Sequence, residues 1–501
     1  MHIIHIASEL APLAKVGGLA DVLLGLSREL SWKGHDVDII IPRYDCIDSN
    51  EIRDLSIVQN DLMTPYDGGW FSNTVWMGWV ENLRVYFIDP HHPRYFFNRG
   101  CFYGCDDDIE RYLYFSRIAM EFILKQPFRA DVIHIHDWQT AIIPVLYKEM
   151  YKELGFPDTK FVFTIHNFDY QGKCSSSDLD KIGLKGSEFL TSSKLQDPTN
   201  PALINLLKGG IVYSDFFTTV SPTYSKEVKG AEGRGLEKVV IQNQNKFAGI
   251  LNGVDYSFWN PEIDRYLPVH FSPREMPANK KDRNTIDKKG FVKKLLRERL
   301  CISEEHKPIV GSITRLVPQK GVELIKAAIH HTLANGGQFV LLGSTSIPEI
   351  SDEFHALKHQ LADNPNVHLL LHHQEDIAHL IFAASDMFIV PSLFEPCGLT
   401  QLIALKYGSI PIVRHTGGLA DTIFDVDNSG KPFDETNGFV FNNPDKQSIE
   451  LTLDRAFNYW FHQPDKWRKL MINSMYMDYS WNKSSNKYLD IYQSLIKGAL
   501  P

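Results

Sequence analysis

The feature that most restricts the fold of this chain is a short apolar run followed by an amphipathic helix and then by a second apolar run. Residues 2–7 are apolar and β-branched, and residues 37–41 form a similar run. Between them, apolar residues recur at helical spacing: Leu19, Val22, Leu23, Leu26 and Leu30. A strand, a helix and a strand in this order form a parallel βαβ unit. Similar runs at 131–136 and 160–165 predict that the sheet continues.

A second series of alternating strands and helices begins near residue 307. Strands are expected at 309–313, 338–342, 387–390 and 410–413, and helices at 322–333, 377–384 and 399–407. Because single hydrophobic cores stop growing at roughly 250–300 residues, two domains are expected. The segment 255–306 is rich in Pro, Asn and Lys and holds the boundary. The sequence thus predicts an α/β protein with two doubly wound domains, residues 1–255 and 256–480.

The composition argues against several classes of protein. The net charge of −9 disfavours a nucleic-acid partner, which would require an excess of Lys and Arg. No segment has the ~18 consecutive apolar residues of a membrane helix, and residues 1–7 indicate a buried strand, not a signal peptide. Six scattered cysteines indicate a reducing compartment, so a cytoplasmic protein is expected. The lack of a G-x-G-x-x-G motif disfavours an NAD oxidoreductase.

Two cationic loops are candidates for binding a phosphorylated ligand. In the loop Lys15–Gly18, two glycines allow close approach, the following helix start offers N–H groups, and Lys15 adds a charge. The loop after the strand near 309–313 carries Arg315 and Lys320, five residues apart, which could bracket a diphosphate. For the first loop, the alternative is an ordinary turn at a helix start with a solvated lysine. For the second loop, the alternative is a pair of ordinary surface cations.

A third loop, residues 394–400, joins a predicted strand to a helix. Glu395 could accept hydrogen bonds from sugar hydroxyls, while N–H groups of Gly398, Leu399 and Thr400 at the helix start could bind a phosphate. The alternative is a carboxylate that caps the helix. Two further polar tips follow strands, His136-Asp137-Trp138 and His166-Asn167, where ligands of open parallel sheets bind.

Possible metal ligands have simpler interpretations. His134 and His136 lie on one strand face like a metal pair, but no further ligand is near in sequence, so core or ligand-contact roles are favoured. The Asp-x-Asp patterns at 36–38 and 425–427 are expected to be incidental. Cys101 and Cys105 lack the second Cys/His pair of a zinc site. No metal and no cofactor are therefore expected.

The motifs together resemble those of the bacterial glycogen synthase and plant starch synthase family. In the first half they are Ser8-Glu9, Lys15-Val16-Gly17-Gly18-Leu19-Ala20-Asp21, His136-Asp137-Trp138, Thr164-Ile165-His166-Asn167, Thr219-Val220-Ser221-Pro222-Thr223-Tyr224 and Ile250-Leu251-Asn252-Gly253-Val254-Asp255. In the second half they are Arg315-Leu316-Val317-Pro318-Gln319-Lys320-Gly321, Phe394-Glu395-Pro396-Cys397-Gly398-Leu399-Thr400-Gln401 and Thr416-Gly417-Gly418-Leu419-Ala420-Asp421-Thr422. They occur in family order over nearly the whole chain.

The resemblance implies a retaining glucosyltransferase of GT-B fold, with two Rossmann-like domains facing across a cleft. It implies ADP-glucose as donor, the non-reducing end of an α-1,4-glucan as acceptor, and a helix at 481–501 that crosses back to the first domain. The first domain would serve the acceptor and the second the nucleotide sugar. The implied catalytic residues are Lys15, His166, Arg315, Lys320 and Glu395. The implied substrate-binding residues are Lys15, Gly17, Gly18, Asp21, Tyr103 near the nucleotide, Asp137, Asn167, Asn252, Cys397, Gly398, Leu399 and Thr400.

Several alternatives stay open at the level of the sequence. UDP-glucose is the rival donor, and a non-catalytic glucan-binding relative is a second class of function. That class would be indicated by loss of Lys15, Arg315, Lys320 or Glu395, all of which are present. Retention could proceed through a covalent carboxylate intermediate or by same-face attack, and same-face attack is favoured because no carboxylate stands out as a nucleophile. An oligomer is compatible with the sequence.

Overall fold

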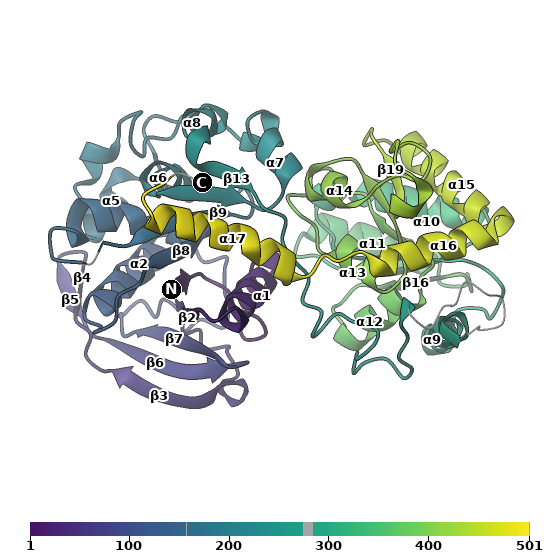
Figure 1. Ribbon diagram of the computed structural model, residues 1–501, viewed down its shortest axis with the longest axis horizontal. Helices are drawn as coiled ribbons and strands as arrows, with labels where there is room; N and C mark the ends of the chain where they lie inside the picture. The colour runs from purple at the N-terminus through teal and green to yellow at the C-terminus, as the bar shows by residue number, and fades with distance from the viewer. Residues whose placement is uncertain (157, 274–283, 500–501) are drawn as a thin grey trace. The chain divides into compact units, whose positions relative to one another are not determined.

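The computed structural model describes residues 1–501 except 157, 274–283 and 500–501 (Figure 1). The chain forms two compact units. The first, here called the N-terminal unit, comprises Met1–Gly253 and Trp481–Pro501. The second, the C-terminal unit, comprises Val254–Ser480. Each unit is built around its own sheet, as the two series of strands in the sequence predict.

The N-terminal unit contains a nine-stranded sheet in the order β13-β12-β9-β8-β1-β2-β7-β6-β3. Seven strands from β13 to β7 are parallel, and β6 and β3 extend the sheet as antiparallel strands. The strands of this sheet are β1 (His2–Ile6), β2 (Asp36–Pro42), β3 (Arg53–Gln59), β6 (Asn73–Val80), β7 (Leu83–Pro90), β8 (Val132–His136), β9 (Lys160–Ile165), β12 (Phe216–Thr219) and β13 (Phe247–Gly249). Two small antiparallel pairs are β4 (Thr64–Tyr66) with β5 (Gly69–Phe71) and β10 (Lys173–Cys174) with β11 (Ile204–Asn205).

The helices in this unit, apart from the last one, lie in the connections between parallel strands. They are α1 (Gly18–Trp32), α2 (Asp108–Leu124), α3 (Asp137–Thr140), α4 (Ile143–Leu146), α5 (Ser176–Lys181), α6 (Leu206–Tyr213), α7 (Pro222–Glu227), α8 (Glu237–Gln242) and α17 (Trp481–Ile496). Central strands such as β8 are buried along their whole length, which explains their nearly continuous apolar sequence. The predicted strands and the helix after residue 18 are confirmed. The antiparallel pairs are not among the predicted elements.

The last helix, α17, packs against α1 in the N-terminal unit (Figure 1). Trp481 and Tyr492 of α17 are buried in one cluster with Val22 and Leu26 of α1. Gly25 of α1 lies beneath Trp481, and a Cβ at this position would be 2.1 Å from Nε1 of the indole. Close contact between the two helices therefore depends on a residue without a side chain.

Replacing Gly25 by alanine is expected to destabilise the N-terminal unit by about 1–3 kcal/mol, because the added methyl group overpacks a filled contact. Thermal unfolding of the purified variant measures this effect. Gly290→Ala is the matched control, since Gly290 is exposed in a helix with nothing within 4 Å of its Cβ position. There, alanine is expected to raise stability slightly. Equal unfolding temperatures for wild type and Gly25→Ala would contradict the proposed contact.

The C-terminal unit contains a six-stranded, fully parallel sheet in the order β16-β15-β14-β17-β18-β19. Its strands are β14 (Ile309–Arg315), β15 (Gln338–Ser344), β16 (Val367–Leu370), β17 (Met387–Val390), β18 (Ile410–Arg414) and β19 (Phe439–Phe441). Its helices are α9 (Asn284–Leu300), α10 (Val322–Ala334), α11 (Pro348–Gln360), α12 (Glu375–Ala384), α13 (Thr400–Lys406), α14 (Gly417–Thr422), α15 (Lys446–His462) and α16 (Pro464–Tyr476). The predicted strands and helices of the second series are confirmed, with ends shifted by one or two residues.

The strand order reverses direction on either side of β1 in the first sheet and of β14 in the second. Such a switch opens a crevice outside the carboxyl ends of the strands, where ligands of doubly wound sheets bind. No helix in the described part of the chain is both long and apolar enough to cross a membrane.

Candidate active site

The loop after β1 is held by Glu9, a buried carboxylate. The backbone N–H groups of Val16 and Gly17 donate to its Oε2 at 2.9 and 3.0 Å, and the Tyr103 hydroxyl donates to its Oε1 at 2.8 Å. Two backbone N–H groups of the loop that the sequence suggested for a ligand are therefore occupied by Glu9. Glu9 belongs to one of the family motifs, but its role is not predictable from the sequence, because a contact to residues seven and eight positions later has no periodic signal.

Lys15 and the glycines occupy the start of α1. The Nζ of Lys15 lies 2.9 Å from Oδ1 of Asp21, one turn into the helix, so this lysine is paired and not merely solvated. Gly17 is the N-cap and Gly18 the first helical residue. The side chains of Lys15 and Asp21, both predicted to bind substrate, remain partly exposed. Their charges are therefore accessible to a ligand at this helix start.

Replacing Glu9 by alanine is expected to speed amide exchange at Val16 and Gly17 at least tenfold, because hydrogen bonds to a charged group contribute about 1.5–3 kcal/mol each. Hydrogen–deuterium exchange followed by mass spectrometry measures the change on the peptide that covers the loop. Glu51→Ala, which removes an exposed glutamate of the same unit, is expected to leave that peptide unchanged. Slow exchange in the Glu9 variant would contradict the assigned role.

Asp137 follows β8 in a left-handed backbone conformation with φ of 56°. Its Oδ1 accepts a hydrogen bond of 2.7 Å from the backbone N–H of His166, which follows the neighbouring strand β9. Burial raises the pKa of the Asp137 carboxyl to about 7, and the nearby Glu9 charge contributes in the same direction. The structure thus brings together Asp137 and His166 at the carboxyl ends of two neighbouring parallel strands.

Four histidines gather beside Asp137. They are His5 on β1, His134 and His136 on β8, and His166 after β9. The ring centroids of neighbouring histidines in this group lie 4.3–5.5 Å apart. Both nitrogens of His134 are engaged by hydroxyl groups, Nδ1 by Tyr492 at 2.6 Å and Nε2 by Thr164 at 2.7 Å. His134 therefore has the hydrogen bonds of a core residue, which agrees with the interpretation that the sequence favoured.

The remaining predicted residues of this unit lie near the same sheet edge. Asn252 follows β13 and is nearly buried, and its Oδ1 has no hydrogen-bond partner among the described residues. Asn167 is half-buried after β9, where its side chain accepts from the N–H of Asp169 at 3.0 Å. The Tyr103 ring packs near Tyr112, and its place beside a nucleotide stays a prediction.

In the C-terminal unit, Lys320 and Glu395 form an ion pair, with 2.5 Å between Nζ and Oε2. Lys320 ends a single 3-10 turn after β14, and Glu395 follows β17, the neighbouring strand. The hydroxyl of Ser392 donates to the same carboxylate oxygen at 2.8 Å. Glu395 is 6% exposed. The capping interpretation of Glu395 is wrong, because its carboxylate binds Lys320 and Ser392 and α13 has no side-chain N-cap.

The loops that carry this pair are fixed by backbone contacts. The N–H of Leu393 donates to the carbonyl of Gln319 at 2.8 Å. Gly321 has φ of 70°, and a Cβ there would lie 2.3 Å from the carbonyl oxygen of Pro391. A side chain at Gly321 would therefore separate the two loops, which explains the Lys320-Gly321 sequence.

The 395–400 loop leads into α13 and packs against the start of α14. Gly417 and Gly418 have Cβ positions only 2.0 Å from the carbonyl oxygens of Glu395 and Cys397, so glycine is needed at both. Cys397 is buried, Gly398 adopts φ of 73°, and Leu399 and Thr400 begin α13. Arg315 at the end of β14 is exposed. Its charge is thus accessible at the sheet edge where Lys320 and Glu395 meet.

Other motifs have structural explanations. Asp38 binds Arg84 at 2.5 Å and His2 at 2.8 Å, and Asp425 binds Arg455 at 2.8 Å. Both Asp-x-Asp patterns, which are expected from the sequence to be incidental, thus contribute to ion pairs. The sulfur atoms of Cys101 and Cys105 lie 3.6 Å apart as free thiols.

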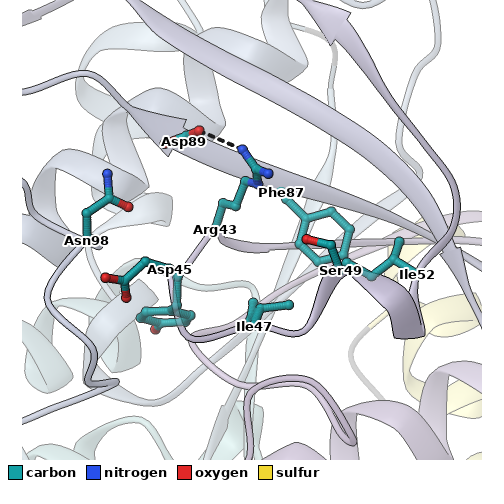
Figure 2. A pocket seen from close by; sticks show the side chains of 9 residues that line it. Arg43, Asp45, Ile47, Ser49, Ile52, Phe87, Asp89 and Asn98 are labelled. Carbon is teal, nitrogen blue, oxygen red and sulfur yellow. Dashed lines mark hydrogen bonds and ion pairs between the residues drawn. The ribbon is translucent and has the colours of Figure 1, made fainter.

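A pocket of about 340 Å³ lies in the N-terminal unit, where β2 and β7 end (Figure 2). Arg43 projects into it and pairs with Asp89 at 2.9 Å, while its guanidinium covers the Trp76 ring. None of its lining residues is among the predicted site residues. They are Arg43, Tyr44, Asp45, Ile47, Ser49, Ile52, Phe87, Asp89 and Asn98.

Two family models match this chain. The starch synthase catalytic domain matches residues 2–242, and the glycosyl transferases group 1 family matches residues 301–471. Together they cover every strand of the two main sheets except β13. The solved sucrose-phosphate synthase from Thermosynechococcus elongatus superposes with a TM-score of 0.62 over 100% of both chains at 14% identity, which shows a shared fold.

Individual relatives are similar over nearly the whole chain. A glycogen synthase of Protochlamydia amoebophila is 66% identical over 99% of both chains. A probable starch synthase 4 of Arabidopsis thaliana is 44% identical over 100% of this chain and 47% of its own length. The solved catalytic domain of Starch Synthase IV from Arabidopsis thaliana, bound to ADP and acarbose, has a TM-score of 0.94, 45% identity and 99% coverage of both chains. The chain therefore belongs to the glycogen synthase and starch synthase family of glycosyltransferases with the GT-B fold.

Proposed function

We propose that this protein is a glycogen synthase that transfers glucose from ADP-glucose to the non-reducing end of an α-1,4-glucan, with retention at the anomeric carbon. The observation that carries the proposal is the Lys320–Glu395 pair at the carboxyl ends of neighbouring strands. A fixed cation there suits a diphosphate, and a carboxylate beside it suits sugar hydroxyls. The family, and the ADP bound to the related Starch Synthase IV domain, support the choice of donor.

The reaction assigned to these residues is a same-face displacement. The bond between the glucose C1 and the phosphate oxygen breaks, and its electron pair stays on the departing ADP. The acceptor hydroxyl oxygen bonds to C1 from the same face, and its proton passes to the departing phosphate. Arg315 and Lys320 stabilise the charge that develops on that phosphate, more strongly in the transition state than in the ground state.

The other predicted residues bind and orient the substrates under this proposal. Glu395 holds the transferred glucose, and the loop Cys397, Gly398, Leu399 and Thr400 binds the sugar and the distal phosphate. In the N-terminal unit, Lys15 with Gly17 and Gly18 binds donor phosphate, while Asp21, Asp137, His166, Asn167 and Asn252 contact the sugar. Tyr103 lies near the nucleotide. The acceptor glucan is assigned to the N-terminal unit, and the cytoplasm is the proposed location.

Parallel assays with ADP-glucose and UDP-glucose test the proposal. Glucose incorporation into glycogen is expected to be faster with ADP-glucose at equal concentrations, and the product linkage to be α-1,4. Faster incorporation from UDP-glucose would identify UDP-glucose as the donor and would leave the proposed class of reaction unchanged. No incorporation from either donor, with glycogen still bound, would favour the non-catalytic glucan-binding alternative. The presence of Lys15, Arg315, Lys320 and Glu395 argues against that alternative.

A further inference from the structure

Three of the four clustered histidines form a hydrogen-bonded chain. Nδ1 of His5 lies 3.2 Å from Nε2 of His136, and Nδ1 of His136 lies 3.2 Å from Nε2 of His166. His5 and His136 have no exposed surface, whereas His166 is half-buried. The chain of rings thus runs from the interior of the sheet to the strand end that carries Asp137.

The three imidazoles are neutral at pH 7. Burial lowers the pKa of His5 and of His166 to about 3, and burial together with the neighbouring histidines lowers the pKa of His136 well below its usual range. A neutral imidazole has one N–H and one bare nitrogen. Because each hydrogen bond needs one proton, the two bonds can both form in only two arrangements.

In the first arrangement, His5 donates from Nδ1 to His136, and His136 donates from Nδ1 to His166. The Nδ1 of His166 then carries its proton, and the Nε2 of His5 is bare. In the second, every proton is on the opposite nitrogen, and the Nε2–H of His5 is buried. Among the described residues, no group is hydrogen-bonded to that Nε2 atom. A buried N–H without an acceptor is rarer than a buried acceptor without a donor, which favours the first arrangement.

We infer that His5 and His136 are positioning residues that hold His166 as its Nδ1–H tautomer, so that His166 donates a hydrogen bond to an oxygen of the bound donor. The use of this hydrogen bond rests on the proposed function, whereas the tautomer rests on the hydrogen-bond chain alone. None of the described residues is hydrogen-bonded to Nδ1 of His166, so this N–H is available to a ligand.

The first test reads the tautomer directly in the full-length protein. With ¹⁵N-labelled histidine, long-range correlation spectra distinguish a protonated from a bare ring nitrogen, and the His166 signals are assigned by their loss in His166→Gln. Wild type is expected to show a protonated Nδ1 on His166. His5→Leu is expected to convert part of the population to the Nε2–H form. A bare Nδ1 in wild type, or an unchanged His166 signal in His5→Leu, would overturn the inference.

Two further variants separate the hydrogen bonds from packing. His5→Asn keeps an N–H donor near the place of Nδ1 and is expected to restore the wild-type signal. His134→Leu is the matched control, because His134 is equally buried and lies beside His136 but has its hydrogen bonds elsewhere. It is expected to leave the His166 tautomer unchanged. A change of tautomer in His134→Leu equal to that in His5→Leu would show a packing effect and overturn the inference.

Kinetics then test what the tautomer does. His5→Leu is expected to lower kcat about tenfold with little change in KM for ADP-glucose, which is less than direct loss of a transition-state donor. In His136→Asn the amide donates to His166 without help from His5, so adding His5→Leu is expected to have no further effect. A further tenfold loss of kcat in the double variant would contradict the hydrogen-bonded chain, in which His5 acts on His166 only through His136. If His5→Leu shifts the tautomer of His166 but leaves turnover unchanged, His5 and His136 still position His166. The role of His166 in the proposed function would then be wrong.

Discussion

Replacing Lys320 by alanine is expected to lower the turnover of glucose transfer by about 10²–10³-fold, the effect of removing one preorganised charge contact in a transition state. The Nζ of Lys320 lies 2.5 Å from Oε2 of Glu395, and a backbone hydrogen bond from Leu393 to Gln319 joins the two loops that carry this pair. Its charge is therefore in place before the phosphate departs. Binding of glycogen is expected to stay near the wild-type value, because the acceptor is assigned to the other unit.

Initial rates with saturating ADP-glucose measure turnover, and co-sedimentation with glycogen measures acceptor binding. Lys326→Ala is the matched control. Lys326 lies in α10, six residues further along, and pairs with the partly exposed Glu323 and Glu353. Surface pairs of this kind contribute about 0–1 kcal/mol, so its turnover is expected to be unchanged. Near-wild-type turnover of Lys320→Ala would remove Lys320 from the mechanism.

The same substitution leaves Glu395 as a buried carboxylate that still accepts a hydrogen bond from Ser392. Breaking one side of a buried pair destabilises a protein more than removing both sides. The double variant Lys320→Ala with Glu395→Gln is therefore expected to unfold at a higher temperature than Lys320→Ala, while its turnover stays low. This difference separates loss of charge at the reacting phosphate from loss of folded protein.

The sequence predicts the sheets well because each parallel strand is an apolar run and each crossover helix is amphipathic. It also places Lys320 and Glu395 at strand ends. Their direct contact is not predictable from spacing, since they are 75 residues apart and meet only because β14 and β17 are neighbours in the sheet. The histidine chain has the same origin. His5 and His136 lie on two strands and His166 follows a third, and no local pattern encodes the order of these strands in the sheet.

Other features were missed for different physical reasons. Glu9 binds the backbone of Val16 and Gly17, and a backbone N–H leaves no trace in the residue type that carries it. The antiparallel strands β6 and β3 lie at a sheet edge, and β3 is largely exposed, so it lacks the apolar run by which the buried strands were recognised. The left-handed conformation of Asp137 is tolerated by aspartate and therefore has no glycine to mark it.

Replacing Asp137 by asparagine is expected to make the protein more stable at pH 8 and far less active. Burial raises the pKa of Asp137 in the folded protein to about 7, above its ordinary value of 3.8. Between these two values the folded state retains a proton that the unfolded state has lost, so the free energy of unfolding falls as the pH rises through this window. Above pH 7 the full loss of unfolding free energy is present. It amounts to up to about 4 kcal/mol, because each unit of difference between the two pKa values corresponds to about 1.36 kcal/mol.

Asparagine removes the charge and keeps the features that the fold uses. It tolerates the φ of 56°, and its Oδ1 can accept the 2.7 Å hydrogen bond from the N–H of His166. Denaturant unfolding at pH 4 and pH 8 is expected to show a gain of about 1–4 kcal/mol at pH 8 that largely disappears at pH 4. Asp158→Asn, with a side chain 80% exposed, is the control and is expected to show no such gain.

Turnover of Asp137→Asn is expected to fall by about 10²-fold, because an amide replaces the carboxylate that is proposed to accept from a sugar hydroxyl. A buried charge that lowers stability and is retained only for activity is the trade-off expected at a functional site. Lower stability than wild type at pH 8 would show that the carboxylate supports the fold. Higher stability with full activity would leave the charge of Asp137 without a catalytic reason, and the donor-sugar role assigned to it would fail.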